Sequence, residues 1–419
     1  MNSARRLAMM LLALALFCAA AIIVNYLTNP YGAWRTALID PIFRADSDPR
    51  MVTPYLVRTM RPETLLVGSS RVRVGMAIEQ GYRDGVLNGA LQGVDAEEAV
   101  EVIRVALHNP KLKRIVWGVD FFSFDDRRTP DRDTMARLRG NPWSMFSETL
   151  LNLGALDSGR REFNRAWHGR KGLRAEWTRP VPWPQAEVCE GLAAPARPSL
   201  DSIGGAKIQL QLIGDVPDYT GYRLSQRKLN DFATAVALAR RRGIEVIVFV
   251  PPISGYVLEM IRQSGQWPNF QRWKRALLAA GPYWDFSGYH AFALTFALFK
   301  DVMHFRQAVG QLLLRGLLGL NTSGCDLRSR VVTDAGTWVD ELSFCDVQKT
   351  QEARMRAATT APESDFVRAA AQALAARGFS PSVLVARSER VVPETAAPGG
   401  HIGASCCSCD TSRQPSDHP

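Results

Sequence analysis

The sequence predicts an α/β fold in which a parallel sheet is flanked by helices, with an N-terminal transmembrane helix and a Trp/Pro-rich insertion. Three observations predict this architecture. Short apolar runs alternate along the chain with amphipathic segments of helical period, as in parallel sheets covered on both faces. One N-terminal apolar run is long enough to cross a bilayer. A central stretch breaks the alternation and has only weak periodicity.

The N-terminal apolar run extends without interruption from Leu7 to Val24, after two arginines. Its 18 residues approach the ~20 that a membrane-spanning helix needs. The apolar region of a cleaved signal peptide is usually shorter, roughly 7–15 residues. The run also continues past the small residues that end at Ala21 into Ile22, which favours an uncleaved anchor. A signal peptide cleaved after Ala21 is the alternative.

The charge distribution around this run predicts its orientation. Arginines precede the run and no charged residue follows it until Arg35, so the positive end should stay inside. Residues 1–6 are therefore expected in the cytoplasm and residues 7–27 in the membrane. Residues 28–62 are interpreted as a linker. We predict a single-pass protein of a bacterial inner (plasma) membrane whose main domain is periplasmic, with the lipid bilayer as a partner.

The first strand–helix–strand unit follows the linker. Thr64–Val67 is a short apolar run that predicts a buried strand. Asp95 is expected to open a helix, because Glu98 stands three residues later in the spacing of a capping box. Arg114–Val119 predicts the next buried strand.

A second unit has the same alternation of apolar runs and amphipathic segments. A helix is expected from about Ser225, with Gly243 at its end. Four further elements are expected in chain order: a strand at Ile244–Val250, a helix at Phe270–Ala280, a strand at Tyr283–Phe286 and a helix at about His304–Leu318.

Changes in composition along the chain predict the domain boundaries. The α/β domain is expected over residues 63–320, with an insertion at 123–224 that is partly helical around Phe146–Leu153. Tryptophans in this insertion suit stacking on sugar rings, with core or lid packing as the alternative. Residues 321–419 form an atypical tail with one expected helix at Asp365–Arg377. From about Val391 the composition predicts disorder.

Composition also excludes some classes of function. The net charge is +10, but Lys and Arg are scattered and no nucleic-acid-binding motif occurs, so no nucleic acid is expected as a partner. A basic surface also suits an anionic membrane or an acidic polysaccharide. The seven cysteines form no framework with histidines at metal-ligand spacing. We therefore expect no metal and no cofactor.

Two short motifs contain candidate catalytic residues. Gly68-Ser69-Ser70-Arg71 directly follows the first strand, at the edge of a parallel sheet where ligands bind. The alternative is that one of its serines only caps the next helix. Asp301 and His304 stand three residues apart far downstream, so the carboxylate can orient the imidazole and the imidazole can take a proton from a serine. The expected helix N-terminus would also keep the imidazole neutral. Here too the alternative is capping, with Asp301 as N-cap and His304 at the surface.

The order of these motifs resembles that of the SGNH/GDSL hydrolase superfamily, over roughly Glu63 to Leu318. The resemblance implies a flavodoxin-like sheet with Ser70 as the nucleophile in Gly-Ser-Ser, where the family usually has Gly-Asp-Ser. It implies Asp301 and His304 as the rest of the triad. It also implies Gly93, in Asn-Gly-Ala-Leu-Gln-Gly, as an oxyanion-hole donor beside the Ser70 amide.

This sequence departs from the family pattern in the third block. Gly118-Val119-Asp120-Phe121 has Asp120 where the family has an asparagine that donates to the oxyanion. An ionised carboxylate there would repel the developing charge, whereas a donor is usually worth ~3 kcal/mol. Asp120 is therefore expected to be protonated, turned away from the oxyanion, or paired with Arg71. We also interpret Arg71 as a substrate-binding residue.

The anchor and the motifs together are similar to exported SGNH-like proteins of the alginate O-acetylation and D-alanyl-lipoteichoic-acid transfer type. The resemblance implies a serine esterase or O-acyltransferase acting on a cell-surface or secreted glycan, with an acyl-donor membrane protein as a partner. The alternative is a non-catalytic polysaccharide-binding or assembly factor on the same fold. His290 is a further polar residue near the expected cleft, with a lone surface histidine as the alternative.

Overall fold

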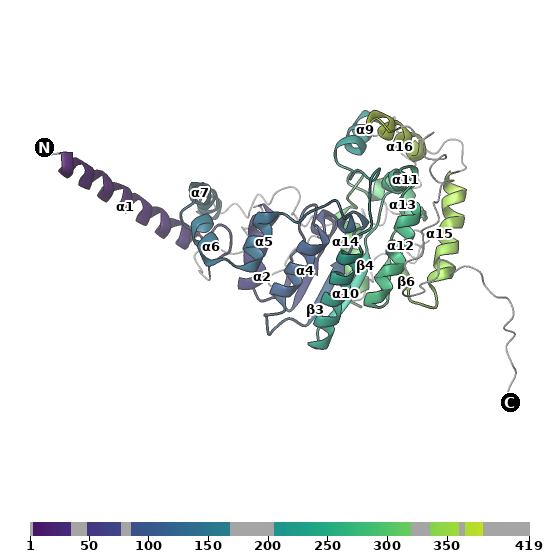
Figure 1. The fold of residues 1–419 in the computed structure, drawn as a ribbon, viewed down its shortest axis with the longest axis horizontal. Coiled ribbons are helices and arrows are strands. Elements are labelled where there is room, and N and C mark those ends of the chain that lie inside the picture. The colour runs from purple at the N-terminus through teal and green to yellow at the C-terminus, as the bar shows by residue number, and fades with distance from the viewer. Residues whose placement is uncertain are drawn as a thin grey trace, which may run out of the picture.

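The computed structural model describes residues 3–34, 48–76, 85–167, 205–319, 336–359 and 365–379. Figure 1 shows a long N-terminal helix that projects from a body of mixed helices and strands. The predicted disordered end from about Val391 lies outside the described residues, as do Trp177 and Trp183 of the insertion.

The body contains a six-stranded sheet of order β2-β1-β3-β4-β5-β6. All neighbouring strands run parallel except β6, which is antiparallel to β5. The strands are β1 (Thr64–Val67), β2 (Val86–Asn88), β3 (Arg114–Gly118), β4 (Glu245–Val250), β5 (Tyr283–Asp285) and β6 (Thr337–Val339). The mixed α/β class and the mostly parallel sheet are thereby confirmed.

The middle of the sheet is covered on both faces. Successive side chains of a strand point to opposite faces, yet Leu65 and Leu66 of β1 are both fully buried. The same holds for Ile115 and Val116 of β3. These residues pair directly, Leu65 with Ile115 and Leu66 with Val116. Water reaches neither face of these strands, which explains why their sequences are continuous apolar runs.

Three helices form one layer over the sheet, side by side in Figure 1. They are α4 (Ala96–Ala106), α10 (Gln226–Arg241) and α12 (Trp267–Leu277). Helix α4 begins with the predicted capping box, since Asp95 accepts from the Glu97 amide and the Glu98 side chain accepts from the Asp95 amide. Helix α12 begins three residues earlier than expected, with a proline in its first turn.

Other elements complete the body. They are α3 (Ser70–Gly75), η2 (Phe121–Phe124), α11 (Gly255–Gln263), η3 (Leu278–Ala280), α13 (Ala291–Leu294), η4 (Phe296–Leu298), α14 (Gln307–Leu317), α15 (Phe344–Thr359) and α16 (Asp365–Ala376). Helix α14 starts three residues after the predicted start at His304. Residues 299–305 before it form a turn, in which the Lys300 amide donates to the His304 carbonyl and Phe299 forms a bridge with Phe305.

The region predicted as an atypical tail contributes to the sheet, so the α/β domain does not end at residue 320. Strand β6 pairs with β5, and Trp338 packs against Trp284 with ring centroids 5.2 Å apart. Helix α16, where a helix was predicted, packs on α11. A three-residue edge strand has too few residues for a recognisable period, which is why the sequence did not predict it.

The predicted linker over residues 28–62 contains a packed helix, α2 (Pro49–Thr59). Its residues Val52, Tyr55 and Val57 are buried, and it contacts α4 and α5 (Arg132–Arg139). The interpretation of the whole segment as a linker is therefore wrong. An internal proline, Pro54, obscured the helical pattern.

The insertion is more helical than predicted. It contains α5, α6 (Pro142–Thr149), α7 (Leu153–Trp167) and α9 (Gly205–Gly214). The range around Phe146–Leu153, expected to be partly helical, contains the end of α6 and the start of α7, and Asn152 between them accepts from the Gly154 amide at 2.7 Å. Trp143 is 70% exposed and does not belong to the core.

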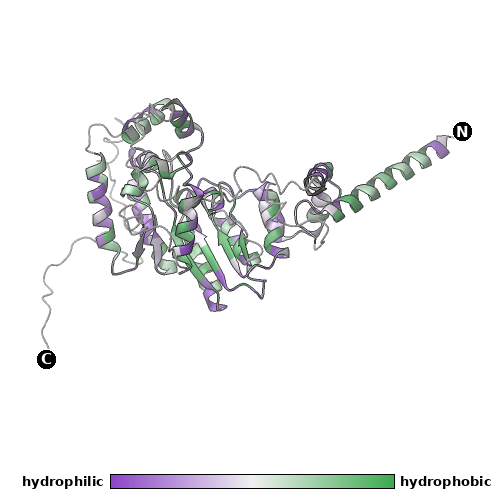
Figure 2. Cartoon of the chain, turned by 180° about the vertical axis from the view of Figure 1, so that it is seen from behind, coloured by the Kyte–Doolittle hydropathy of each residue, from purple (hydrophilic) through white to green (hydrophobic). Residues whose placement is uncertain are grey.

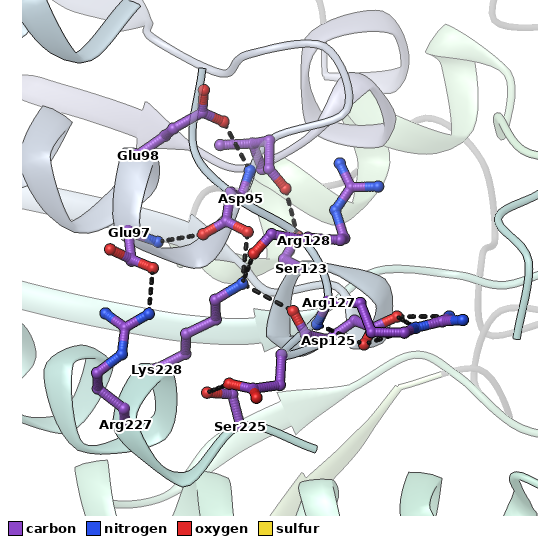
Figure 3. A network of polar contacts seen from close by, with 12 residues as sticks. Asp95, Glu97, Glu98, Ser123, Asp125, Arg127, Arg128, Ser225, Arg227 and Lys228 are labelled. Atoms are coloured by element: carbon purple, nitrogen blue, oxygen red, sulfur yellow. Dashed lines mark hydrogen bonds and ion pairs between the residues drawn. The ribbon is translucent and has the colours of Figure 1, made fainter. Parts of the chain in front are cut away.

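The buried side chain of Lys228, which follows the insertion, links the start of the insertion to the N-terminus of α4 (Figure 3). Lys228 Nζ lies 2.6 Å from Asp95 Oδ2, and both side chains are almost fully buried. The ammonium group also donates to the carbonyls of Asp125 and Arg128, at 2.7 and 2.9 Å. An antiparallel bridge between Asp125 and Leu224 closes the insertion at its base.

Replacement of Lys228 by Met should destabilise the domain by about 3–5 kcal/mol, because it leaves the Asp95 carboxylate buried without its counter-charge. Arg227→Met is the matched control at the adjacent position: Arg227 pairs with Glu97 (Figure 3) but is itself 60% exposed, so the loss should be at most about 1 kcal/mol. Urea denaturation of both variants measures the difference. Equal stabilities would show that the buried pair does not secure the insertion.

Candidate active site

The candidate nucleophile follows β1 at the carboxyl edge of the sheet. Gly68 has φ +152°, and a Cβ atom there would lie 2.5 Å from Val72 Cγ2 and 2.8 Å from the Gly118 carbonyl oxygen. Only glycine therefore fits at this turn. Ser69 is the N-cap of α3, and its hydroxyl accepts from the Arg71 amide at 3.1 Å. The capping alternative thus applies to Ser69, whereas Ser70 is the first helical residue and is half-buried.

Asp301 and His304 lie in the turn before α14. Asp301 Oδ1 accepts from the amides of Met303 and His304, both at 2.8 Å. His304 Nδ1 lies 2.8 Å and 2.9 Å from the two Asp301 carboxylate oxygens. One carboxylate thus fixes both the backbone of the turn and the ring of the histidine.

The structure brings the three predicted residues together. His304 Nε2 lies 2.8 Å from Ser70 Oγ, across 234 residues of sequence. The side chains of His304 and Asp301 are only 17% and 15% exposed. If His304 carries its proton on Nδ1, toward the carboxylate, Nε2 is the acceptor for the Ser70 hydroxyl. The surface position considered for His304 is therefore not found, and its contact with Ser70 comes from the turn rather than from a helix N-terminus.

The environment of Asp301 favours its ionised form. Burial alone would raise the pKa of Asp301, but hydrogen bonding and attraction from His304, together with the two backbone amides, lower the pKa below its usual value. The carboxylate can therefore orient the imidazole and stabilise an imidazolium.

Arg71 and Asp120 form a buried ion pair behind the three residues. Arg71 Nη1 donates to Asp120 Oδ1, and each side chain is 1% exposed. Arg71 Nε donates to the Met303 carbonyl at 3.0 Å. Since Arg71 follows Ser70 and Met303 precedes His304, this guanidinium links the nucleophile segment to the histidine turn.

These contacts change the role expected for Arg71 and decide among the three arrangements expected for Asp120. Arg71 is enclosed by protein, so a direct contact with substrate is not supported in this conformation. Asp120 was expected to be protonated, turned away from the oxyanion, or paired with Arg71, and in the structure it is paired with Arg71. Asp120 Oδ2 is buried and has no hydrogen-bond partner among the described residues. The carboxylate thus acts on the site through Arg71.

The loop after β2 lies against the nucleophile turn. The Leu91 amide donates to the Gly68 carbonyl at 2.9 Å. Two residues later, Gly93 has φ +58°, and its carbonyl accepts from Arg128 Nη2 at 2.7 Å and Arg50 Nη2 at 3.4 Å. Two guanidinium groups from distant segments therefore orient the Gly93 peptide.

The sequence did not point to several residues that position the site. Asn88 Nδ2 donates to the Val72 and Met76 carbonyls of α3 and its cap, at 3.3 and 3.2 Å. Ser254 Oγ donates to the Val302 carbonyl at 2.6 Å, inside the histidine turn. Both contacts join segments far apart in the chain, and no spacing pattern signals them.

His290 is buried rather than at the surface. It is 5% exposed, its Nε2 lies 3.0 Å from the Phe286 carbonyl oxygen, and its Nδ1 caps α13. Among the residues that the structure describes, no group of three or more His, Cys, Asp or Glu side chains could hold a metal ion.

A cavity of about 280 Å³ lies at the base of the insertion, between residues 122–128 and 217–222. Phe122 lines it and lies under both Arg71 and Arg128, with 5.9 and 5.3 Å from guanidinium carbon to ring centroid. Tyr219 and Tyr222 from the end of the insertion line it as well. The cavity thus combines aromatic side chains with two arginines and the carboxylates of Asp125 and Asp218.

A scan of the chain against protein-family models finds no match, and a search of curated proteins finds none either. A functional assignment therefore depends on the fold and on the geometry of Ser70, Asp301 and His304.

The buried pair makes a prediction about Asp120. Asp120→Asn leaves the Arg71 charge uncompensated, so we expect a loss of stability of about 3–5 kcal/mol and lower activity. The control is the double variant Arg71→Met, Asp120→Leu, which removes both charges and should recover much of the stability. Thermal unfolding measures both. An Asp120→Asn protein that is as stable as the wild type and more active would instead make Asp120 an oxyanion-site residue.

Proposed function

We propose that this protein is a membrane-anchored serine esterase or O-acyltransferase of the SGNH type. One observation supports this most strongly: Ser70 Oγ, His304 and Asp301 form a continuous hydrogen-bonded chain with 2.8 Å at each link. A serine, a base and an orienting carboxylate within hydrogen-bond reach are the arrangement that activates a hydroxyl nucleophile.

The reaction follows from this geometry. His304 Nε2 takes the proton of the Ser70 hydroxyl while Oγ attacks an acyl carbonyl. Asp301 holds the Nδ1 proton and stabilises the imidazolium that forms. His304 then protonates the leaving alcohol, and an acyl-serine results. In the second half, His304 deprotonates water or a sugar hydroxyl, which attacks the acyl carbon; the bond to Ser70 Oγ breaks and His304 returns the proton to Oγ.

The oxyanion is assigned to backbone amides. The Ser70 amide lies in the first turn of α3, and the Gly93 amide belongs to the loop that is tied to Gly68. Asp120 is not included, since its carboxylate pairs with Arg71. Two donors in place of three predict slower acyl chemistry, because one such donor contributes ~3 kcal/mol.

A glycan is the proposed acceptor. The cavity at the base of the insertion is lined by Phe122, Tyr219 and Tyr222 together with charged side chains, and this mixture of apolar and polar groups suits a sugar. Arg127 is paired with Asp125 on its wall, and Arg128 and Asp218 offer further donors and acceptors for hydroxyl groups. An acyl-donor membrane protein is proposed as the second partner, because the enzyme would be held at the bilayer.

Among the described residues, α1 (Ser3–Thr28) is the one helix long and apolar enough to cross a membrane, and its apolar part is not buried against the protein. Arg5 and Arg6 at its start support the orientation proposed here, with the main domain on the periplasmic side.

A non-catalytic polysaccharide-binding factor on the same fold is the second candidate. The carboxylate of Asp120 at the position of a family oxyanion donor favours it, since a binding protein has no need of that donor.

Esterase assays on a simple acetyl ester separate the two candidates. Ser70→Ala should abolish turnover, and Asp301→Asn should lower kcat by about 10⁴-fold, because the imidazole loses its orienting acceptor. Ser147→Ala, a serine of α6, is the matched control and should keep wild-type activity. If wild-type protein shows no turnover while it binds glycan, and Ser70→Ala binds equally well, the binding factor is the correct assignment.

A further inference from the structure

Two helices of the insertion contact the end of the membrane helix. In Figure 1, α6 and α7 lie at the end of α1. Asn25 in the last turns of α1 is 1% exposed, and its Nδ2 donates to the Leu150 and Asn152 carbonyls at 2.9 and 3.3 Å. Further along, Gly159 of α7 packs so closely on Thr28 that a Cβ there would lie 2.3 Å from the Thr28 hydroxyl.

The apolar length of α1 gives the depth of this contact. The run from Leu7 to Val24 has 18 residues, which span about 27 Å at 1.5 Å per residue, close to the ~30 Å of a hydrocarbon core. Asn25 is the next residue and therefore lies at the boundary between acyl chains and headgroups. Because their carbonyls bind the Asn25 side chain, Leu150 and Asn152 lie at the same level.

Large apolar side chains of the same segment are exposed. Leu151 stands between the two residues that bind Asn25 and is 41% exposed, and Leu153 is 64% exposed. Trp143 on α6 is 70% exposed and stacks on Phe146 with centroids 5.9 Å apart. Helix α6 is held at α1 by the Trp34 indole, whose Nε1 donates to Thr149 Oγ1 at 3.1 Å.

The charge of this segment does not favour anionic partners. Residues 141–167 contain three carboxylates and three arginines, which balance: Glu148, Asp157, Glu162, Arg160, Arg161 and Arg165. Exposed Trp and Leu without net positive charge suit the interfacial zone of a bilayer, where an indole has an apolar body in the lipid and a polar N–H in water.

We propose that α6 and α7 form an interfacial foot that inserts Trp143, Leu151 and Leu153 into the headgroup region of the bilayer crossed by α1. The foot rests on the proposed membrane anchoring, but not on the proposed chemistry. It would hold the sheet at a fixed height and tilt above the membrane, since α1 alone would leave the domain free to swing. The Ser70 site would then face a defined layer above the lipid surface.

Fluorescence quenching by lipids tests the foot. The full-length protein is reconstituted in phosphatidylcholine vesicles with acyl chains brominated close to the headgroup, and quenching is compared for wild type, Trp143→Phe and Trp338→Phe. Trp338 is a matched control, because it is 46% exposed but lies on β6 at the far edge of the sheet. Removal of Trp143 should lower the quenched fraction by at least about twice the change caused by removal of Trp338. Vesicles with anionic lipid should give the same difference.

Two outcomes would overturn the proposal. Equal changes in the two variants would show that Trp143 does not reach the lipid. A Trp143 that is shielded from both lipid and aqueous quenchers, in a protein that sediments as a dimer, would assign this surface to a second copy of the chain. Esterase turnover of the same Trp143→Phe sample tests the proposed function separately. Turnover depends on Ser70, so its presence or absence neither supports nor contradicts the foot.

Discussion

The buried pair between Arg71 and Asp120 is the interaction on which the candidate site depends. It joins three segments that only the fold brings together: the start of α3 after β1, the end of β3, and the turn before α14. Two charges that are each 1% exposed are costly to bury unless their geometry is nearly ideal. Arg71 also donates to the Met303 carbonyl, so the same cation neutralises Asp120 and holds the histidine turn.

This contact accounts for the position of the Asp120 carboxylate. Asp120 is paired with Arg71 and buried, so its charge does not face solvent at the candidate site. Ser70 is adjacent to Arg71 and His304 is adjacent to Met303, so a shift of the guanidinium would change the distance between nucleophile and base. The three side chains are thus positioned by buried groups outside their own hydrogen-bonded chain, a kind of support that catalytic geometry would require.

The sequence predicted much of the fold where the physical signal is local. The strands at Thr64–Val67 and around Val116, and the capping box at Asp95, depend on neighbouring residues and are found as expected. The edge strands β2 and β6 were not predicted, because three residues carry no period. Helix α2 was taken for a linker, because its stabilisation comes from packing on α4 and α5.

For the site, the order of motifs was enough to predict that Ser70, Asp301 and His304 would converge, although the helix expected at His304 begins only at Gln307. The burial of Arg71 and the supporting contacts of Asn88 and Ser254 were beyond prediction, since each depends on a carbonyl far away in the chain. Side chains that bind distant backbone leave no spacing pattern in a sequence.

The proposed function requires that His304 activates Ser70 for attack on an acyl group. Covalent labelling with a fluorophosphonate tests this activation most directly, because the reagent reacts with activated serines and its adduct can be located by peptide mass spectrometry. We expect one adduct on Ser70, still formed in Ser69→Ala and lost in His304→Ala. A wild-type protein without an adduct, or with labelling on Ser70 that persists in His304→Ala, would contradict it.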